Sequence, residues 1–135
     1  MIPFLDLHAQ YLSIKDEIDE AIKDVIANSS FIRGKYVDLF EKKFQELFCI
    51  PYCISCGNGT DALFIAMKAL DIQYQDEVIV PAHSWISSSE TVTQAGGKVV
   101  FCDVDPNTFT IDPKKIEEKI TSKTVGIIPV HLFGQ

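Results

Sequence analysis

The second part of the chain alternates between two hydrophobic patterns, and this alternation constrains the fold more than any other feature. Short apolar runs, typical of buried strands, are separated by stretches with hydrophobic residues three or four positions apart, as in helices. Strands that alternate with helices form a mainly parallel sheet with helices on both faces, so the pattern predicts the α/β class. The predicted strands are 52–56, 77–81, 98–102 and 124–131, and the predicted helices are 60–70, about 85–95 and 113–120.

The first 50 residues carry helical patterns instead. From about 10 to 27, isoleucines and a valine recur at helical spacing, and over 35–48 aromatic residues repeat the spacing until Pro51. We therefore expect an N-terminal helical segment (1–50) followed by the first part of an α/β large domain (51–135). The helices are expected to pack on the α/β part or on a partner subunit.

The last predicted strand is almost wholly apolar from Val125 to His131, as a strand buried on both faces should be. An uncovered sheet edge of this kind would invite aggregation, and a parallel strand normally leads into a helix. We expect either that a partner covers this strand or that the chain is the first part of a longer protein.

A glycine turn, Gly57-Asn58-Gly59-Thr60-Asp61, joins the first predicted strand to the next helix. Glycine allows a sharp turn and a close approach to a ligand, and the unpaired N–H groups at a helix start attract anions. The turn therefore suits a phosphate. The same residues also fit an ordinary turn in which Thr60 and Asp61 serve only to start the helix.

Ligands of open α/β sheets collect beyond the carboxyl ends of the strands. At that edge the predicted strands lead into the glycine turn and into residues 81–85, 103–105 and 131–135. Trp85, the single tryptophan, would suit a flat phosphorylated aromatic molecule, whose ring can stack on the indole. The alternative is that Trp85 is a core residue of its own helix.

The net charge of the chain restricts the classes of partner that it can bind. A net charge of −7 argues against nucleic acid and anionic membranes, which both require a basic face, but leaves a small anionic ligand possible. No apolar run approaches the about 20 residues of a membrane span, and the first residues do not resemble an export signal. The expected location is the cytoplasm.

Four cysteines stand at positions 49, 53, 56 and 102. Cys53 and Cys56 match a C-x-x-C pair, but in a strand positions three apart point to opposite faces, and no second pair completes a zinc site. We therefore expect no metal site and interpret the cysteines as buried free thiols.

The glycine turn also fits the G-x-G-x-x-A pattern of Rossmann-type dinucleotide-binding domains. That pattern requires an acidic residue about 20 positions further on, at the end of the second strand. Positions 83–85 hold His, Ser and Trp instead, and Asp76 and Glu77 precede the strand, at its other end. The dinucleotide interpretation therefore ranks second.

Six blocks of residues follow one another in an order and spacing that resemble the first part of one enzyme family, the DegT/DnrJ/StrS-type sugar aminotransferases. The resemblance covers essentially the whole chain and decides against the dinucleotide interpretation. The blocks are Phe31-Ile32-Arg33-Gly34 with Phe40-Glu41, Gly57-Asn58-Gly59-Thr60-Asp61-Ala62-Leu63, Asp76-Glu77-Val78-Ile79-Val80-Pro81, Ala95-Gly96-Gly97, Val100-Phe101-Cys102-Asp103-Val104-Asp105, and Ile128-Pro129-Val130-His131-Leu132-Phe133-Gly134-Gln135.

The resemblance implies an enzyme dependent on pyridoxal 5'-phosphate (PLP), with the fold type I architecture of aspartate aminotransferase. Such enzymes work as homodimers on nucleotide-linked keto-sugars, usually with glutamate as amino donor. By position, Gly59, Thr60 and Asp61 would hold the cofactor phosphate, and Trp85 would stack on the pyridine ring. Arg33 would approach the substrate, or else be an exposed arginine without a ligand.

The resemblance also places the remaining catalytic parts beyond Gln135. They are the lysine that binds the cofactor covalently, the aspartate that pairs with the pyridine nitrogen, and a small C-terminal domain. No lysine of this chain falls in the family's lysine motif, so no catalytic residue is assigned within it. We expect an N-terminal fragment that does not transaminate alone; the alternative is a non-catalytic remnant that at most binds or dimerises.

Overall fold

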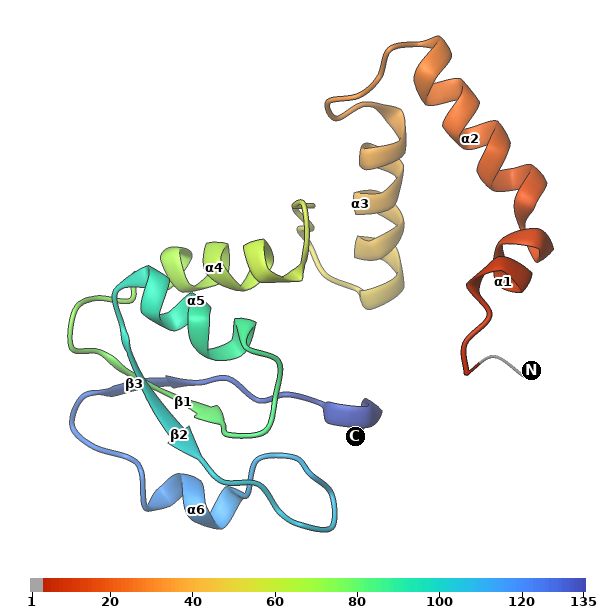
Figure 1. Ribbon diagram of the computed structural model, residues 1–135. Helices are drawn as coiled ribbons and strands as arrows, with labels where there is room; N and C mark the ends of the chain where they lie inside the picture. Colours follow the sequence, from red (N-terminus) through yellow and green to blue (C-terminus); the bar gives the residue numbers. More distant parts are fainter. Residues whose placement is uncertain (1–3) are drawn as a thin grey trace. The chain divides into compact units, whose positions relative to one another are not determined.

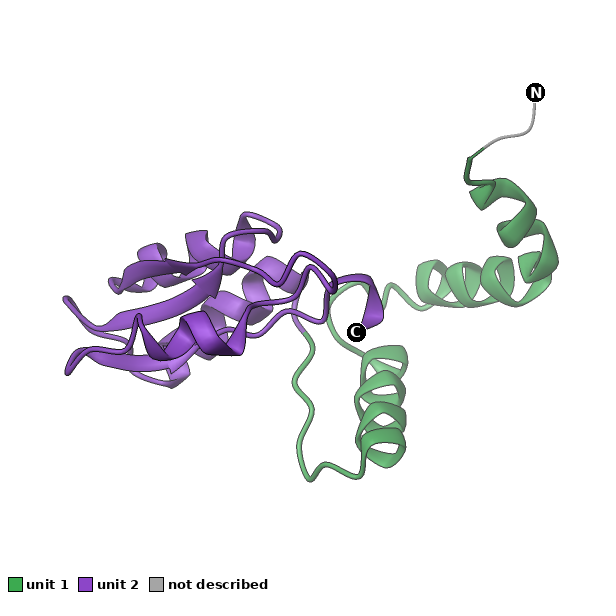
Figure 2. Cartoon of the chain, turned by 90° about the horizontal axis from the view of Figure 1, so that it is seen from below, with its two compact units in different colours: residues 1–55 green, residues 56–135 purple. Residues whose placement is uncertain are grey.

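The computed structural model describes residues 4–135 and divides the chain into two compact units, Met1–Ser55 and Cys56–Gln135 (Figure 2). The first unit is helical and the second contains the sheet (Figure 1). Among the described residues, no helix is both long enough and apolar enough to cross a membrane.

The first unit begins with two helices where the sequence predicts one. These helices are α1 (Leu7–Ser13) and α2 (Lys15–Ala27), and the break falls at Ile14, with φ −127° and ψ 18°. The N–H group of Ile14 bonds to the carbonyl of Tyr11, three positions back, which closes α1 in a tight turn. The hydrophobic spacing continues across this break, so periodicity alone does not reveal it.

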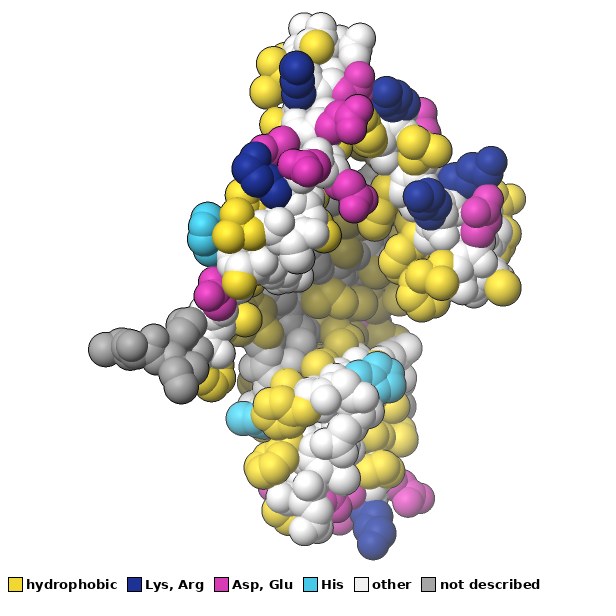
Figure 3. Space-filling view, turned by 90° about the vertical axis from the view of Figure 1, so that its right-hand side faces the viewer, with side chains coloured by type: hydrophobic (Ala, Val, Ile, Leu, Met, Phe, Trp, Pro, Cys, Tyr) yellow, Lys and Arg dark blue, Asp and Glu magenta, His cyan; other side chains and the backbone are white. Residues whose placement is uncertain are grey.

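Helix α3 (Lys35–Phe48) has the bounds that the sequence predicts. It follows Gly34, whose φ of 101° suits glycine, and its Lys35 ammonium lies 2.7 Å from the Asp24 carboxylate of α2. No residue of these three helices is buried within the part of the chain that the structure describes. Hydrophobic side chains therefore lie open on the helix surfaces, coloured yellow in Figure 3.

The second unit is built on a three-stranded parallel sheet with strand order β2-β1-β3, which confirms the α/β class. Strands β1 and β2 have their predicted bounds, whereas α6 and β3 are shorter than predicted. The elements are α4 (Gly59–Ala69), β1 (Glu77–Pro81), α5 (Ser87–Ala95), β2 (Lys98–Cys102), α6 (Pro113–Glu117), β3 (Thr124–Ile127) and the 3-10 helix η1 (Leu132–Gly134).

The core lies between the sheet and two helices. Val78 and Val80 of β1 point to one face, where they pack with Met67 of α4 and Val92 of α5. The alternate residue, Ile79, is fully buried and points to the other face. Figure 1 shows α4 and α5 on one side of the sheet and α6 on the other, so helices cover both faces as predicted.

Two adjacent glycines make the passage from α5 to β2 possible. Gly96 ends α5 with a φ of 106°, a conformation that L-residues with side chains rarely adopt. Gly97 approaches its neighbours so closely that a Cβ atom there would lie 2.7 Å from Cγ2 of Ile72 and 3.1 Å from Cγ1 of Val92. The glycine pair therefore brings the strand against α5.

The predicted strand 52–56 is not formed, because a strand needs a hydrogen-bonded neighbour and the described residues offer none. Both the N–H and the hydroxyl of Ser55 bond instead to Oε1 of Glu41, each at 2.8 Å. The glycine turn thus follows an irregular segment rather than a strand.

The prediction of buried cysteines is wrong for three of the four thiols. All four cysteines are free, but Cys102 alone is buried, Cys53 is half-buried, and Cys49 and Cys56 are exposed. The argument from strand alternation fails here, because Cys53 and Cys56 lie in the segment that forms no strand.

Candidate functional site

A cavity of about 530 Å³ opens at the carboxyl end of the sheet. Its wall is formed by the start of α4, by residues 84, 85, 87 and 88 at the entry to α5, and by residues 128–131 after β3. Pockets for small molecules commonly measure about 300–1,000 Å³, so a cofactor-sized molecule can enter. The cavity lies where ligands of open α/β sheets bind.

The first turn of α4 leaves two donors open. Asn58 caps the helix, since its side-chain oxygen accepts the Asp61 N–H at 2.9 Å. Among the described residues, the N–H groups of Gly59 and Thr60 have no hydrogen-bond partner. A Cβ atom at Gly59 would meet nothing within 4 Å, so there is room for an anion beside these donors.

The three residues predicted to hold a phosphate do not all lie at the cavity. Gly59 and Thr60 line the cavity, whereas Asp61 is not among its lining residues. The Asp61 carboxylate accepts the side-chain N–H of Asn58 at 3.0 Å, in addition to the capping bond described above. Asn58, rather than Thr60 or Asp61, is the capping residue at this helix start.

Two pairs of hydroxyl groups lie beside the cavity, and one of them joins the start of α4 to the start of α5. Oγ1 of Thr60 lies 2.7 Å from Oγ of Ser87, and Oγ of Ser84 lies 3.0 Å from Oγ of Ser88. Ser87 and Ser88 are each 6% exposed. Our sequence analysis did not identify Ser87 or Ser88, although the serine-rich stretch that follows the second predicted strand was a signal for them.

Trp85 is not a core residue of the described chain, because 78% of it is exposed. It lies before the first residue of α5, Ser87, and not inside the helix predicted to begin near it. The indole lines the same cavity as Gly59 and Thr60. One cavity therefore joins open N–H donors, hydroxyl groups and an exposed aromatic ring.

The two predicted strand-end aspartates after β2 are not among the residues that line the cavity. After β2, the Lys115 ammonium lies 2.7 Å from the Asp103 carboxylate and lowers the pKa of Asp103. The Asp105 carboxylate accepts the Asn107 N–H at 2.7 Å, which lowers the pKa of Asp105. Arg33, in the first unit, is exposed and has a φ of 55°.

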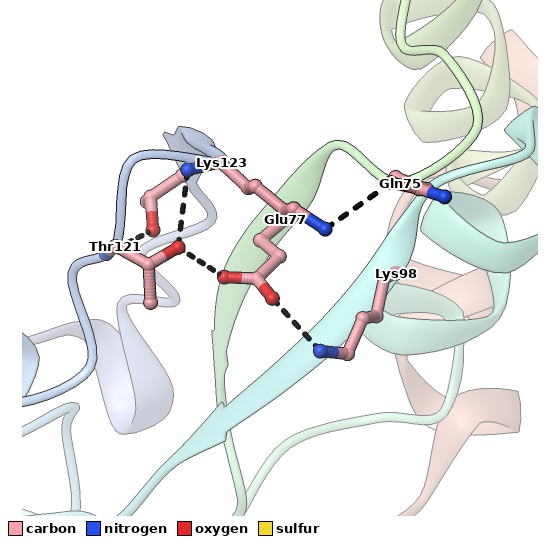
Figure 4. A network of polar contacts seen from close by, with 6 residues as sticks. Gln75, Glu77, Lys98, Thr121 and Lys123 are labelled. Atoms are coloured by element: carbon pink, nitrogen blue, oxygen red, sulfur yellow. Dashed lines mark hydrogen bonds and ion pairs between the residues drawn. The ribbon is translucent and has the colours of Figure 1, made fainter.

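The opposite, amino end of the sheet carries a closed polar network (Figure 4). Glu77 is 6% exposed, and its two carboxylate oxygens meet the Lys98 ammonium at 2.8 Å and the Thr121 hydroxyl at 2.6 Å. The bond to Lys98, followed by the bond to Thr121, lowers the pKa of Glu77. The carboxylate of Glu77 is thus satisfied by the chain itself.

Within residues 4–135, no three His, Cys, Asp or Glu side chains gather as a metal ion would require.

Comparison with known proteins assigns the chain to an enzyme family. Residues 12–135 match the model of one family, described as the DegT/DnrJ/EryC1/StrS aminotransferase family. The chain belongs to this family. The resemblance predicted from the six sequence blocks is thereby confirmed, and the dinucleotide interpretation is set aside.

Two curated aminotransferases match the chain over its whole length. A UDP-2-acetamido-2-deoxy-3-oxo-D-glucuronate aminotransferase of Pseudomonas aeruginosa is 44% identical, and 38% of its length is covered. A dTDP-3-amino-3,6-dideoxy-alpha-D-galactopyranose transaminase of Aneurinibacillus thermoaerophilus is 45% identical, and 37% of its length is covered. The chain therefore spans little more than a third of the length of these relatives.

A solved structure shows the same fold. The crystal structure of NtdA from Bacillus subtilis with bound cofactor PMP has a TM-score of 0.90 and 37% sequence identity to this chain, and the match covers 99% of this chain and 31% of the other. The α/β fold of a PLP-type aminotransferase is thus shown for the part of the architecture that these residues represent.

Proposed function

We propose that these residues form the N-terminal, cofactor-binding part of a PLP-dependent aminotransferase. Its substrate is a nucleotide-linked keto-sugar, its amino donor is glutamate, and it works as a homodimer in the cytoplasm. The observation that carries the proposal is the cavity at the carboxyl end of the sheet, which is lined both by open N–H donors and by an exposed indole. Family membership and the names of the two aminotransferase relatives support it.

The cavity suits the phosphate group of PLP. The open N–H groups of Gly59 and Thr60 would donate to the phosphate, and the helix start adds the positive end of its dipole. The Thr60 hydroxyl, held 2.7 Å from that of Ser87, would donate as well. Asp61 belongs to the proposed set by the family resemblance, although its own N–H is already bonded to Asn58.

The cavity also suits the ring of PLP. The exposed indole of Trp85 would stack on the pyridine ring and shield one of its faces from water. When bound, PLP supplies an electron sink for the carbon atom that loses a proton. The residues of this chain would hold and orient that group, while the lysine of the family motif is expected beyond Gln135.

We propose further that Arg33 contacts the substrate. It is the chain's single arginine, and guanidinium groups bind diphosphates with paired hydrogen bonds. The names of the two relatives point to UDP- or dTDP-linked sugars as the substrate class.

The proposal is tested on the full-length protein that contains these residues. Supplied with PLP, glutamate and a UDP- or dTDP-linked 3-keto-sugar, it should release 2-oxoglutarate and form the amino sugar. Arg33→Lys should raise KM for the sugar nucleotide with less effect on kcat, since lysine keeps the charge but loses the paired hydrogen bonds. Absence of PLP binding by the full-length protein would refute the proposed function, and PLP binding without amino transfer would leave only a binding role.

A further inference from the structure

Three aromatic side chains, one from the segment after each strand, lie next to one another at the carboxyl end of the sheet. His83 follows β1, Phe109 lies in the loop after β2, and Phe133 lies in η1 after β3. The ring centroids of His83 and Phe109 are 6.2 Å apart, and those of Phe109 and Phe133 are 6.1 Å apart at an interplanar angle of 89°. Both separations fall within the range of about 4.5–7 Å at which aromatic pairs attract each other. Phe109 is the central ring of this aromatic row.

The loop after β2 holds Phe109 in an unusual conformation. The φ of Phe109 is 62°, in the left-handed region that bulky residues rarely adopt. The Phe109 N–H bonds to the Asp105 carbonyl at 2.8 Å, while the Asp105 carboxylate accepts the N–H groups of Asn107 and Thr108. Phe109 is 46% exposed, so core burial does not account for this strained placement. Its ring lies against those of His83 and Phe133.

The aromatic row is connected to the cavity through the loop that carries Trp85. This loop is bonded at its two ends, by the Ala82 N–H to the Cys102 carbonyl at 2.7 Å and by the Ser88 N–H to the Trp85 carbonyl at 3.1 Å. Between these points, within the described residues, the N–H groups of residues 83–85 have no hydrogen-bond partner. In this part of the loop the His83 ring lies against Phe109, and the Ser84 hydroxyl lies 3.0 Å from that of Ser88.

We propose that Phe109 is a positioning residue that fixes the Trp85 loop through His83 and so keeps the indole at the cavity. The proposal concerns loop geometry, and its consequence for the cofactor rests on the function proposed above. Loss of the Phe109 ring frees His83, and the indole two residues later then loses its fixed position.

Hydrogen exchange, measured residue by residue in the full-length protein, tests the geometry. The reporters are the N–H groups of Ser88 and Glu90, which bond to the carbonyls of Trp85 and Ile86. In Phe109→Ala these two amides should exchange about 3- to 10-fold faster, which corresponds to the loss of one aromatic pair. The amides of β1, which report global opening, should keep their rates.

Four further variants distinguish the effect of the Phe109 ring from effects of backbone strain and of general packing. Phe109→Tyr should retain the wild-type rates, and Phe109→Gly should exchange as fast as Phe109→Ala, although glycine relieves the backbone strain. Phe101→Ala is the matched control, because Phe101 is 55% exposed on β2 and outside the aromatic row, and it should leave Ser88 and Glu90 unchanged. Phe109→Leu, which keeps apolar volume without a ring, provides the same test should the alanine variant not fold.

Three results would overturn the inference. The first is an unchanged exchange rate of the Ser88 and Glu90 amides in Phe109→Ala. The second is an equal acceleration of exchange throughout β1 in that variant, which would indicate a general effect on packing. The third is wild-type exchange of the two amides in Phe109→Gly, which would mean that the backbone turn, and not the ring, holds the loop.

A cofactor titration then tests the consequence for the site. Phe109→Ala should weaken PLP binding several-fold and should add nothing to the loss in Trp85→Ala, because both act through the indole. Additive losses would overturn the proposed route through Trp85. A wild-type protein that binds no PLP would refute the proposed function, whereas the exchange result would still decide whether Phe109 holds the loop.

Discussion

Alanine substitutions at Gly97 and Gly59 should have separate effects: the first on the stability of the fold, and the second on cofactor binding in the cavity. At Gly97 an added Cβ atom would lie 2.7 Å from Cγ2 of Ile72, with the backbone oxygen of Asp76 also near at 3.4 Å. At Gly59 the same atom would meet nothing within 4 Å. Gly97→Ala should therefore destabilise the second unit, and Gly59→Ala should not.

The expected changes in the free energy of unfolding follow from these distances. Extra carbon in a well-packed core costs about 1–3 kcal/mol, and replacing glycine returns about 0.4–1 kcal/mol by restricting the unfolded chain. Gly97→Ala should thus lower the free energy of unfolding by about 1–2 kcal/mol, and each kcal/mol corresponds to about 4–8 °C in Tm for a unit of this size. Gly59→Ala should be neutral or stabilise by a few tenths of a kcal/mol, since Gly59 is the first residue of α4 and alanine favours helices.

Urea denaturation followed by circular dichroism measures both stabilities, and a PLP titration of the full-length protein measures the cavity. Gly59→Ala should weaken PLP binding, because its methyl group occupies the space beside the open donors. A Gly97→Ala variant as stable as the wild type would refute the close approach of β2 to α5. Unchanged PLP affinity in Gly59→Ala would refute the phosphate position.

Three further measurements address the site, the polar network and the lysines. Trp85→Ala should weaken PLP binding about fivefold, the equivalent of about 1 kcal/mol of stacking, with an unchanged Tm because the indole is 78% exposed; a large fall in Tm would favour a core role. The contact with Lys98 lowers the pKa of Glu77 below its ordinary value of 4.5, so the Glu77 carboxylate stabilises the fold above pH 4.5 and this stabilisation is lost as the pH falls through the lowered pKa. The urea midpoint should therefore vary less with pH in Glu77→Gln, and equal slopes would contradict the network. When residues 1–135 are mixed with PLP and reduced with borohydride, labelling should be sparse over many lysines, and one lysine labelled stoichiometrically would contradict the family assignment of that lysine beyond Gln135.

The elements that the sequence predicts correctly are those with complete local signals. Strands β1 and β2 are short apolar runs, and α3 has helical spacing between a glycine and Pro51. The segment 52–56 shows the same kind of apolar run, yet it forms no strand. Its hydrogen bonds depend on a neighbouring strand, and a local pattern carries no information about that neighbour.

The candidate site is predictable only in part, for the same physical reason. Trp85 is found because it follows the carboxyl end of a parallel strand, and the glycine turn is found because its residues mark a helix start. The contact between Thr60 and Ser87 joins residues 27 positions apart, and Phe109 meets His83 only after the loop at β2 has folded back. Such contacts are determined by tertiary packing, so residue types and spacing do not disclose them.

The two ends of the sheet differ in how far their polar groups are paired, and this difference supports the proposed site at the carboxyl end. At the amino end, the buried Glu77 carboxylate is bonded on both oxygens by the chain itself (Figure 4), so nothing remains for a ligand to satisfy. At the carboxyl end, the N–H groups of Gly59 and Thr60 lack partners among the described residues, and the indole of Trp85 lies open to water. Both features leave this end of the sheet open to a ligand. A ligand that carries a phosphate and an aromatic ring would use both, and PLP is such a molecule.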